Sequence, residues 1–128
     1  RVSDWAKDIM SKPAFTLASE ETELSLARAT VVDLGFTEPQ RLRTILERAA
    51  TFGLLPLPPE AACVLREKYV YQPYGEVLWA AMEPIADSDG LPLLFSVDHD
   101  SDERWLRTLW SDPEGVWGPG GGFVFAGS

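Results

Sequence analysis

The chain has 128 residues and an acidic composition, with 11 Lys and Arg against 20 Asp and Glu side chains and a formal net charge of −9. This length fits a single domain over residues 1–128, and the negative charge argues against binding to nucleic acids or anionic membrane surfaces. The hydrophobic content of 45% excludes a disordered chain, and no apolar run approaches the ~20 residues of a membrane-spanning helix.

The single cysteine, Cys63, excludes an internal disulfide and is typical of a reducing compartment. Residues 1–8 are polar and lack the apolar segment of a signal peptide. The sequence therefore predicts a cytoplasmic protein.

The first half of the chain begins with a short helix over residues 3–11, for which Ser3 is the predicted N-cap and Pro13 the terminator. Residues 23–33 alternate between apolar and small or polar side chains, a period typical of a strand. We therefore expect a helix followed by the first strand of the sheet.

Two further helices are predicted next. Thr37 and Gln40 form a capping-box pattern before a helix over about 38–52, whose apolar residues recur at helical spacing until a glycine. Residues 54–58 are expected to be an extended connector limited by prolines, and a second helix follows over 59–69. This pattern places two helices between the first and second strands.

The rest of the chain, from about residue 76, is predicted to be β-structure separated by short polar breaks, with strands over about 76–83, 92–98, 104–110 and 122–126. Short breaks between short strands favour an antiparallel meander. The predicted fold is therefore α+β, with one strongly curved antiparallel sheet of about five strands, two helices between strands 1 and 2, and a short N-terminal helix.

One predicted strand is apolar on both faces, because Trp105 and Leu109 alternate with Leu106 and Trp110. Two helices cover only one face of such a sheet, so the N-terminal helix, sheet curvature around a cavity or a second subunit must cover the other. We predict a homodimer or a tightly closed monomer, with these four residues as interface candidates.

The sequence gives no pattern for a catalytic or metal centre. Cys63 lies in an apolar run without a neighbouring cation, so we interpret it as structural. His99 has no second nitrogen or sulfur ligand for zinc and is interpreted as a turn histidine. The run Asp87-Ser-Asp-Gly90 lacks the terminal carboxylates of a calcium loop and predicts a hairpin turn. We expect neither a metal nor a cofactor.

Polar side chains gather at the predicted corner between the helix over 59–69 and the next strand. Arg66, Tyr69, Gln72 and Glu76 are placed there by helical spacing and by the chain reversal that Pro73 favours. They could form a structural hydrogen-bond network, or a pocket in which Arg66 binds an anionic group. These four residues are the candidate ligand-binding site.

Several motifs along the chain, taken together, resemble a known family. They are Leu34-Gly-Phe36, Glu47-Arg-Ala, Phe52-Gly-Leu54, Pro59-Glu-Ala, Leu65-Arg66, Tyr69, Gln72-Pro73, Glu76, Ala81-Met82, Ser88-Asp-Gly90, Trp105-Leu, Asp112-Pro, Val116-Trp117 and Phe123-Val-Phe125. Over residues 1–127 the chain resembles a family of small uncharacterised bacterial proteins, often encoded by solitary or mobile-cassette genes. The resemblance carries over no catalytic residue, because the family has no known biochemical activity. Its members often have Cys at the position of Leu57, so the resemblance implies no thiol role for Cys63.

Three function classes follow from these observations. The first is a non-enzymatic module of a bacterial accessory gene that binds a small ligand or a protein through the 66–76 corner or an apolar sheet face. The second is an immunity-type protein that neutralises a toxin, to which the small size, the acidity and the run Gly53-Leu-Leu-Pro56 are loosely similar. The third is an enzyme that uses Glu76, His99 or Asp100 as acid or base, although no paired constellation supports it.

Overall fold

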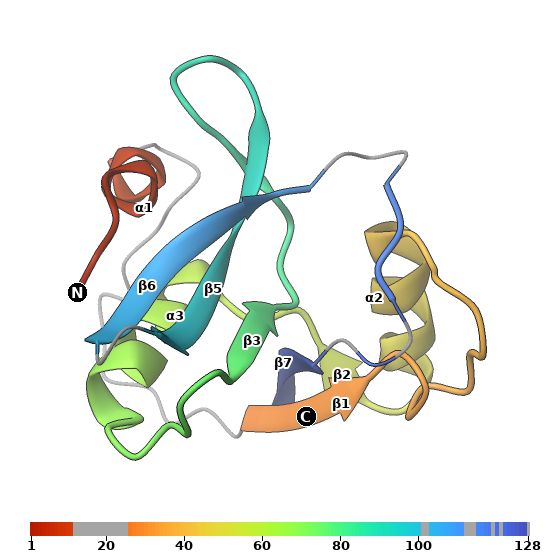
Figure 1. Cartoon of the computed structure of the whole chain (residues 1–128). Coiled ribbons are helices and arrows are strands. Elements are labelled where there is room, and N and C mark those ends of the chain that lie inside the picture. Colours follow the sequence, from red (N-terminus) through yellow and green to blue (C-terminus); the bar gives the residue numbers. More distant parts are fainter. Residues whose placement is uncertain (12–25, 101–102, 112–114, 119, 121, 128) are drawn as a thin grey trace.

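The computed structural model describes residues 1–11, 26–100, 103–111, 115–118, 120 and 122–127 (Figure 1). In chain order, these residues form α1 (Asp4–Met10), β1 (Leu26–Thr30), α2 (Leu42–Thr51), β2 (Leu54–Leu55), α3 (Pro59–Lys68), β3 (Val77–Ala80), β4 (Ile85–Ala86), β5 (Pro92–Asp100), β6 (Glu103–Trp110) and β7 (Gly122–Gly127). The fold is α+β. The predicted end of the first helix at Pro13 and the start of the first strand lie outside the described residues.

The described strands form one open, mixed sheet in the order β1-β7-β3-β5-β4, with β2 also paired to β7 and β6 paired to β5. All the pairs are antiparallel except β3 with β7, which run parallel. The predicted meander of about five strands was therefore wrong. The last strand does not continue beside β6 but returns between β1 and β3.

Burial explains the position of β7. Its four residues from Phe123 to Ala126 are all buried, so both faces of this strand are covered, as expected for the centre of a sheet. The expected placement of two helices between strands 1 and 2 was also wrong, because Leu54 and Leu55 pair with the end of β7 and form β2. Only α2 lies between β1 and β2.

Of the two predicted helix caps, one is present in the structure and one is not. Ser3 caps α1 as predicted, and its hydroxyl accepts a hydrogen bond from the Ala6 N–H at 3.2 Å. The predicted capping box at Thr37 and Gln40 does not start α2, because Gln40 exchanges two backbone hydrogen bonds with Trp117 and is held in an extended bridge. The helix begins at Leu42 instead, without a side-chain cap.

The core is built around aromatic residues of the central strands. Phe95, Phe123 and Phe125 are completely buried, and Trp79 and Trp117 pack edge-on against Phe123 with ring centroids 5.3 and 5.4 Å away. These ring contacts attach the segment around Trp117 to the sheet. None of the described helices is long and apolar enough to cross a membrane.

Strand β6 is covered in part by the N-terminal segment. Both α1 and α3 contact β6, and Val2 forms a parallel bridge with Leu106, which is buried (Figure 1). Trp105 lies between the guanidinium groups of Arg1 and Arg107, 4.6 and 4.3 Å from its ring. Trp110 remains 60% exposed, so one of the four predicted interface residues is available at the surface.

Candidate functional site

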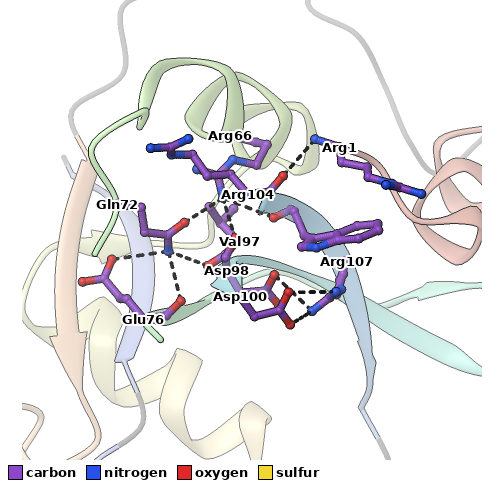
Figure 2. A network of polar contacts seen from close by, with 10 residues as sticks. Arg1, Arg66, Gln72, Glu76, Val97, Asp98, Asp100, Arg104 and Arg107 are labelled. Carbon is purple, nitrogen blue, oxygen red and sulfur yellow. Dashed lines mark hydrogen bonds and ion pairs between the residues drawn. The ribbon is translucent and has the colours of Figure 1, made fainter. Parts of the chain in front are cut away.

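The predicted corner contains a buried arginine at its centre. Arg66, near the end of α3, is only 7% exposed, and its Nη1 donates to Gln72 Oε1 at 2.6 Å and to the Asp98 carbonyl at 2.9 Å (Figure 2). A longer bond of 3.3 Å reaches the Trp105 carbonyl, and Nη2 donates to the Tyr69 carbonyl at 2.8 Å. One guanidinium therefore joins the end of α3 to β5 and β6.

Gln72 extends this network to the next strand. Its side-chain Nε2 donates to the Val97 carbonyl at 2.9 Å and to Glu76 Oε1 at 3.4 Å, and the residue is 2% exposed (Figure 2). The ring Nδ1 of His99, a residue of β5, lies 2.8 Å from the Gln72 carbonyl. The loop between α3 and β3 is thus fixed to the sheet by both ends of one glutamine.

The structure brings the four predicted site residues together and divides them into two groups. Arg66 and Gln72 are buried, and their donors are directed at protein carbonyls and at each other. Burial, with a smaller contribution from Arg104, lowers the pKa of Arg66, as expected for a desolvated cation. Tyr69 and Glu76 keep part of their surface accessible, so they form the side of the corner that a ligand can reach.

A third polar residue joins Tyr69 and Glu76. Arg28, on β1, donates from Nη2 to Glu76 Oε2 at 3.4 Å. Burial raises the pKa of the Tyr69 hydroxyl, and hydrogen bonding to the Glu76 carboxylate raises it further. Arg28 escaped prediction because it lies 48 residues before Glu76, and an exposed arginine in an alternating strand carries no local signal.

Arg28 and Tyr69 border a groove of 270 Å³ between β1, α3 and the centre of the sheet. Its apolar walls are Leu26, Leu65, Leu78 and Val124, and its polar lining residues are Arg28 and Tyr69. Apolar walls with a few convergent polar groups are typical of small-molecule sites, and this volume is near the lower end of their range.

Two carboxylates near the buried Arg66, those of Asp98 and Asp100, pair with a different arginine. Arg107 forms ion pairs with Asp98 at 3.5 Å and, more closely, with Asp100 (Figure 2). Hydrogen bonding to Arg107 lowers the pKa of Asp100, whereas burial raises the pKa of Asp98. Asp100, one of the acid/base candidates, is thus engaged in an ion pair.

The other residues considered for chemistry lack a catalytic partner in the described part of the chain. Burial and the nearby Glu67 and Glu60 raise the pKa of the Cys63 thiol to about 11, so it is protonated at neutral pH. His99 lies within β5 rather than in the predicted turn, and no described hydrogen bond joins its ring to Glu76. The described residues also contain no group of three or more His, Cys, Asp or Glu side chains that could hold a metal ion.

The polar run at 87–90 forms the predicted hairpin turn between β4 and β5. Asp87 Oδ1 accepts the backbone N–H groups of Asp89 and Leu91 at 2.8 and 2.9 Å, and Gly90 has a φ of 82°. A positive φ favours glycine, which explains its position in this turn.

The site thus consists of a small groove with polar side chains at one end, supported by a buried hydrogen-bond network in an α+β fold. No match was found when the chain was compared with protein-family models, with curated proteins and with solved structures.

Proposed function

We propose that the protein is a non-enzymatic binding module that holds a small molecule in the groove beside Arg28 and Tyr69. The observation that carries this proposal is the convergence of Arg28 and Tyr69, both of which interact with Glu76, at a groove whose other walls are apolar. The ligand fitted by this chemistry has an apolar body and one polar group that hydrogen-bonds to the tyrosine hydroxyl or the guanidinium. The resemblance to bacterial accessory proteins and the cytoplasmic location are part of the same proposal.

The binding hypothesis differs from the sequence-based version in the role of Arg66. The sequence suggested Arg66 as the anion-binding group, but the Arg66 guanidinium already donates to four protein acceptors. Arg28 supplies the accessible positive charge instead, since its side chain is 59% exposed. Arg66 and Gln72 then hold the groove in shape rather than contact the ligand.

A thermal-shift screen of small molecules, followed by groove variants, tests this function. A ligand present at 100 times its dissociation constant adds about 2.7 kcal/mol to the free energy of unfolding. Hits that act in the groove are expected to lose this stabilisation in Arg28→Gln and in Val124→Phe, which fills the groove. Arg43→Gln removes the same charge from α2, outside the groove, and should preserve the shift. Hits unaffected by both groove variants would contradict the proposal.

A protein partner is the second candidate, favoured by the exposed aromatic residues of the same corner. Tyr71 is 90% exposed and Tyr74 is 71% exposed, both in the loop between α3 and β3. Tyrosines at such positions are common in protein interfaces, which fits the immunity-type hypothesis. Double substitution to Ser should abolish capture of a toxin encoded by a neighbouring gene and leave the thermal stability unchanged; retained capture would contradict this candidate.

A further inference from the structure

The hydrogen-bond acceptors beside the groove are largely occupied by protein donors. Glu76 Oε1 accepts from Gln72 Nε2 at 3.4 Å (Figure 2). Its Oε2 accepts from Arg28 Nη2, also at 3.4 Å, and the carboxylate accepts from the Tyr69 hydroxyl as well. A carboxylate has about four acceptor positions, so little capacity remains for a ligand. The Glu76 side chain is also only 18% exposed, which limits the access of a ligand to it.

The Tyr69 hydroxyl uses its only donor within the protein. Burial raises the pKa of this hydroxyl most, the hydrogen bond with Glu76 raises the pKa further, and a hydrogen bond with Arg28 lowers it. These opposite effects identify Glu76 as the acceptor of the hydroxyl hydrogen and Arg28 as a donor to the hydroxyl oxygen. Tyr69 can therefore offer a ligand only a lone pair.

Arg28 is the lining residue that has donors left for a ligand. A guanidinium carries N–H donors on all of its nitrogens and has no acceptor. Within the described residues, Arg28 spends these donors only on Glu76 and Tyr69, and its side chain is 59% exposed at the end of the groove. The polar group of a ligand in the groove is therefore expected to be a hydrogen-bond acceptor.

The charges at this end of the groove cancel. The Arg28 guanidinium is paired with the Glu76 carboxylate, and the other lining residues of the groove are uncharged. An anionic ligand on Arg28 would lie beside the Glu76 carboxylate, and a cationic ligand on Glu76 would lie beside the guanidinium, so either ion meets a like charge. The net charge of −9 also repels anions at long range. A neutral ligand avoids all of these costs.

We propose that the groove binds neutral molecules with an apolar chain and a carbonyl group, such as a ketone or an ester, whose oxygen accepts a hydrogen bond from Arg28. The apolar walls bury the chain, and the carbonyl oxygen replaces water on the guanidinium without adding a charge. This inference rests on the proposed function and narrows it to one class of ligand. It replaces the anionic group that the sequence suggested for this corner.

Backbone amide NMR titrations with methyl heptyl ketone, octanoate and octylammonium test this class, because these probes share a heptyl chain and differ in the polar group. At neutral pH the ketone should give saturable shifts confined to groove residues such as Arg28, Leu65 and Val124. It should bind at least about tenfold more tightly than either ion. A ketone one methylene shorter should bind about fourfold more weakly. Octanoate or octylammonium binding as tightly as the ketone would overturn the proposal.

The variant Glu76→Gln tests the charge argument, because it removes the negative charge and keeps a hydrogen-bonding oxygen. It should bind octanoate at least about tenfold more tightly than the wild type, and its affinity for the ketone should change by less than about threefold. Glu47→Gln is the matched control, since Glu47 also pairs with an arginine but lies on α2, outside the groove. Equal octanoate affinities of the two variants, at normal melting temperatures, would refute the proposal. The comparison of the probes on the wild type does not depend on either variant.

Failure of this inference is distinguishable from failure of the proposed function. Octanoate binding as tight as that of the ketone, and abolished by Val124→Phe, would retain the groove as a binding site and refute the neutral class. If no probe binds but hits from the thermal-shift screen act in the groove, only the neutral class is refuted. If no probe binds and no hit depends on the groove variants, both proposals are refuted.

Discussion

Substitution of the buried arginine by methionine, Arg66→Met, tests most directly whether this arginine has a structural role. Methionine fills much of the same space but donates no hydrogen bond. Two buried acceptors lose their closest donor, Gln72 Oε1 at 2.6 Å and the Asp98 carbonyl at 2.9 Å. The Tyr69 carbonyl is only partly buried, so water can replace the lost donor there.

The magnitude follows from these acceptors. A buried acceptor without a partner costs about 1–3 kcal/mol, so two such groups give a loss of about 4 kcal/mol. Removal of the desolvated guanidinium, whose pKa is lowered by burial, offsets part of that loss. We expect a net decrease of about 3 kcal/mol in the free energy of unfolding, which lowers the melting temperature by about 12 °C for a domain of this size.

Thermal unfolding followed by circular dichroism, together with urea unfolding, measures this effect. Arg43→Met is the matched control, because the Arg43 side chain is 90% exposed and its ion pair with Glu47 contributes little. The control should change stability by less than about 0.5 kcal/mol. An Arg66→Met melting temperature equal to that of the control would refute the structural role and favour Arg66 as a ligand anchor.

Three further outcomes are expected. Cys63→Ala should cost less than about 2 kcal/mol and leave any binding intact, since the thiol is half-buried and protonated; loss of binding with normal stability would contradict this. Carboxyl NMR titration should show Asp98 titrating at higher pH than Asp100, and the reverse order would be inconsistent with their environments. The Asp100 ion pair therefore stabilises the fold at neutral pH, and this contribution is lost as the pH falls through the lowered pKa of Asp100. Ionised, buried Asp98 destabilises the fold, and this cost disappears as Asp98 is protonated at its raised pKa. Light scattering distinguishes the predicted homodimer from the closed monomer: Trp110→Lys should dissociate a homodimer, and a wild-type monomer would remove Trp110 from the interface candidates.

Local sequence signals predicted the parts of the fold that depend on neighbouring residues. Ser3 caps α1, Pro59 begins α3, and the turn at 87–90 joins two antiparallel strands. Each of these features involves atoms only a few residues apart, so residue type and spacing suffice to determine it.

Long-range pairing set the features that the sequence did not predict. The capping box at Thr37 and Gln40 satisfies the local rule, but the backbone bridge between Gln40 and Trp117 keeps Gln40 extended and delays α2. Similarly, nothing near Leu54 indicates that it pairs with Gly127, more than seventy residues later. The pattern of strands along the sequence does not specify which strands pair, so it did not predict that β7 lies between β1 and β3.

The clustering of four polar residues was predicted, but Arg28 and the separate roles of the buried and accessible residues were not. Helical spacing and the chain reversal correctly brought Arg66, Tyr69, Gln72 and Glu76 together, because all four lie within one corner. The burial of Arg66 and Gln72 depends on β5, whose carbonyls accept hydrogen bonds from both side chains. The position of β5 beside this corner depends on the sheet topology, which the sequence did not predict. The sequence therefore left open whether the four residues are structural or bind a ligand.

The buried network and the accessible groove are mechanically connected through one residue. Glu76 accepts from Gln72 Nε2 through Oε1 and from Arg28 through Oε2, at 3.4 Å in each case. One carboxylate therefore links the buried donors of the corner to the polar end of the groove. Because side chains held on both sides lose little further freedom when a ligand binds, the network that stabilises the corner also orients the groove's polar groups. The structural role of this network is therefore compatible with the proposed binding function, since the same hydrogen bonds would serve both.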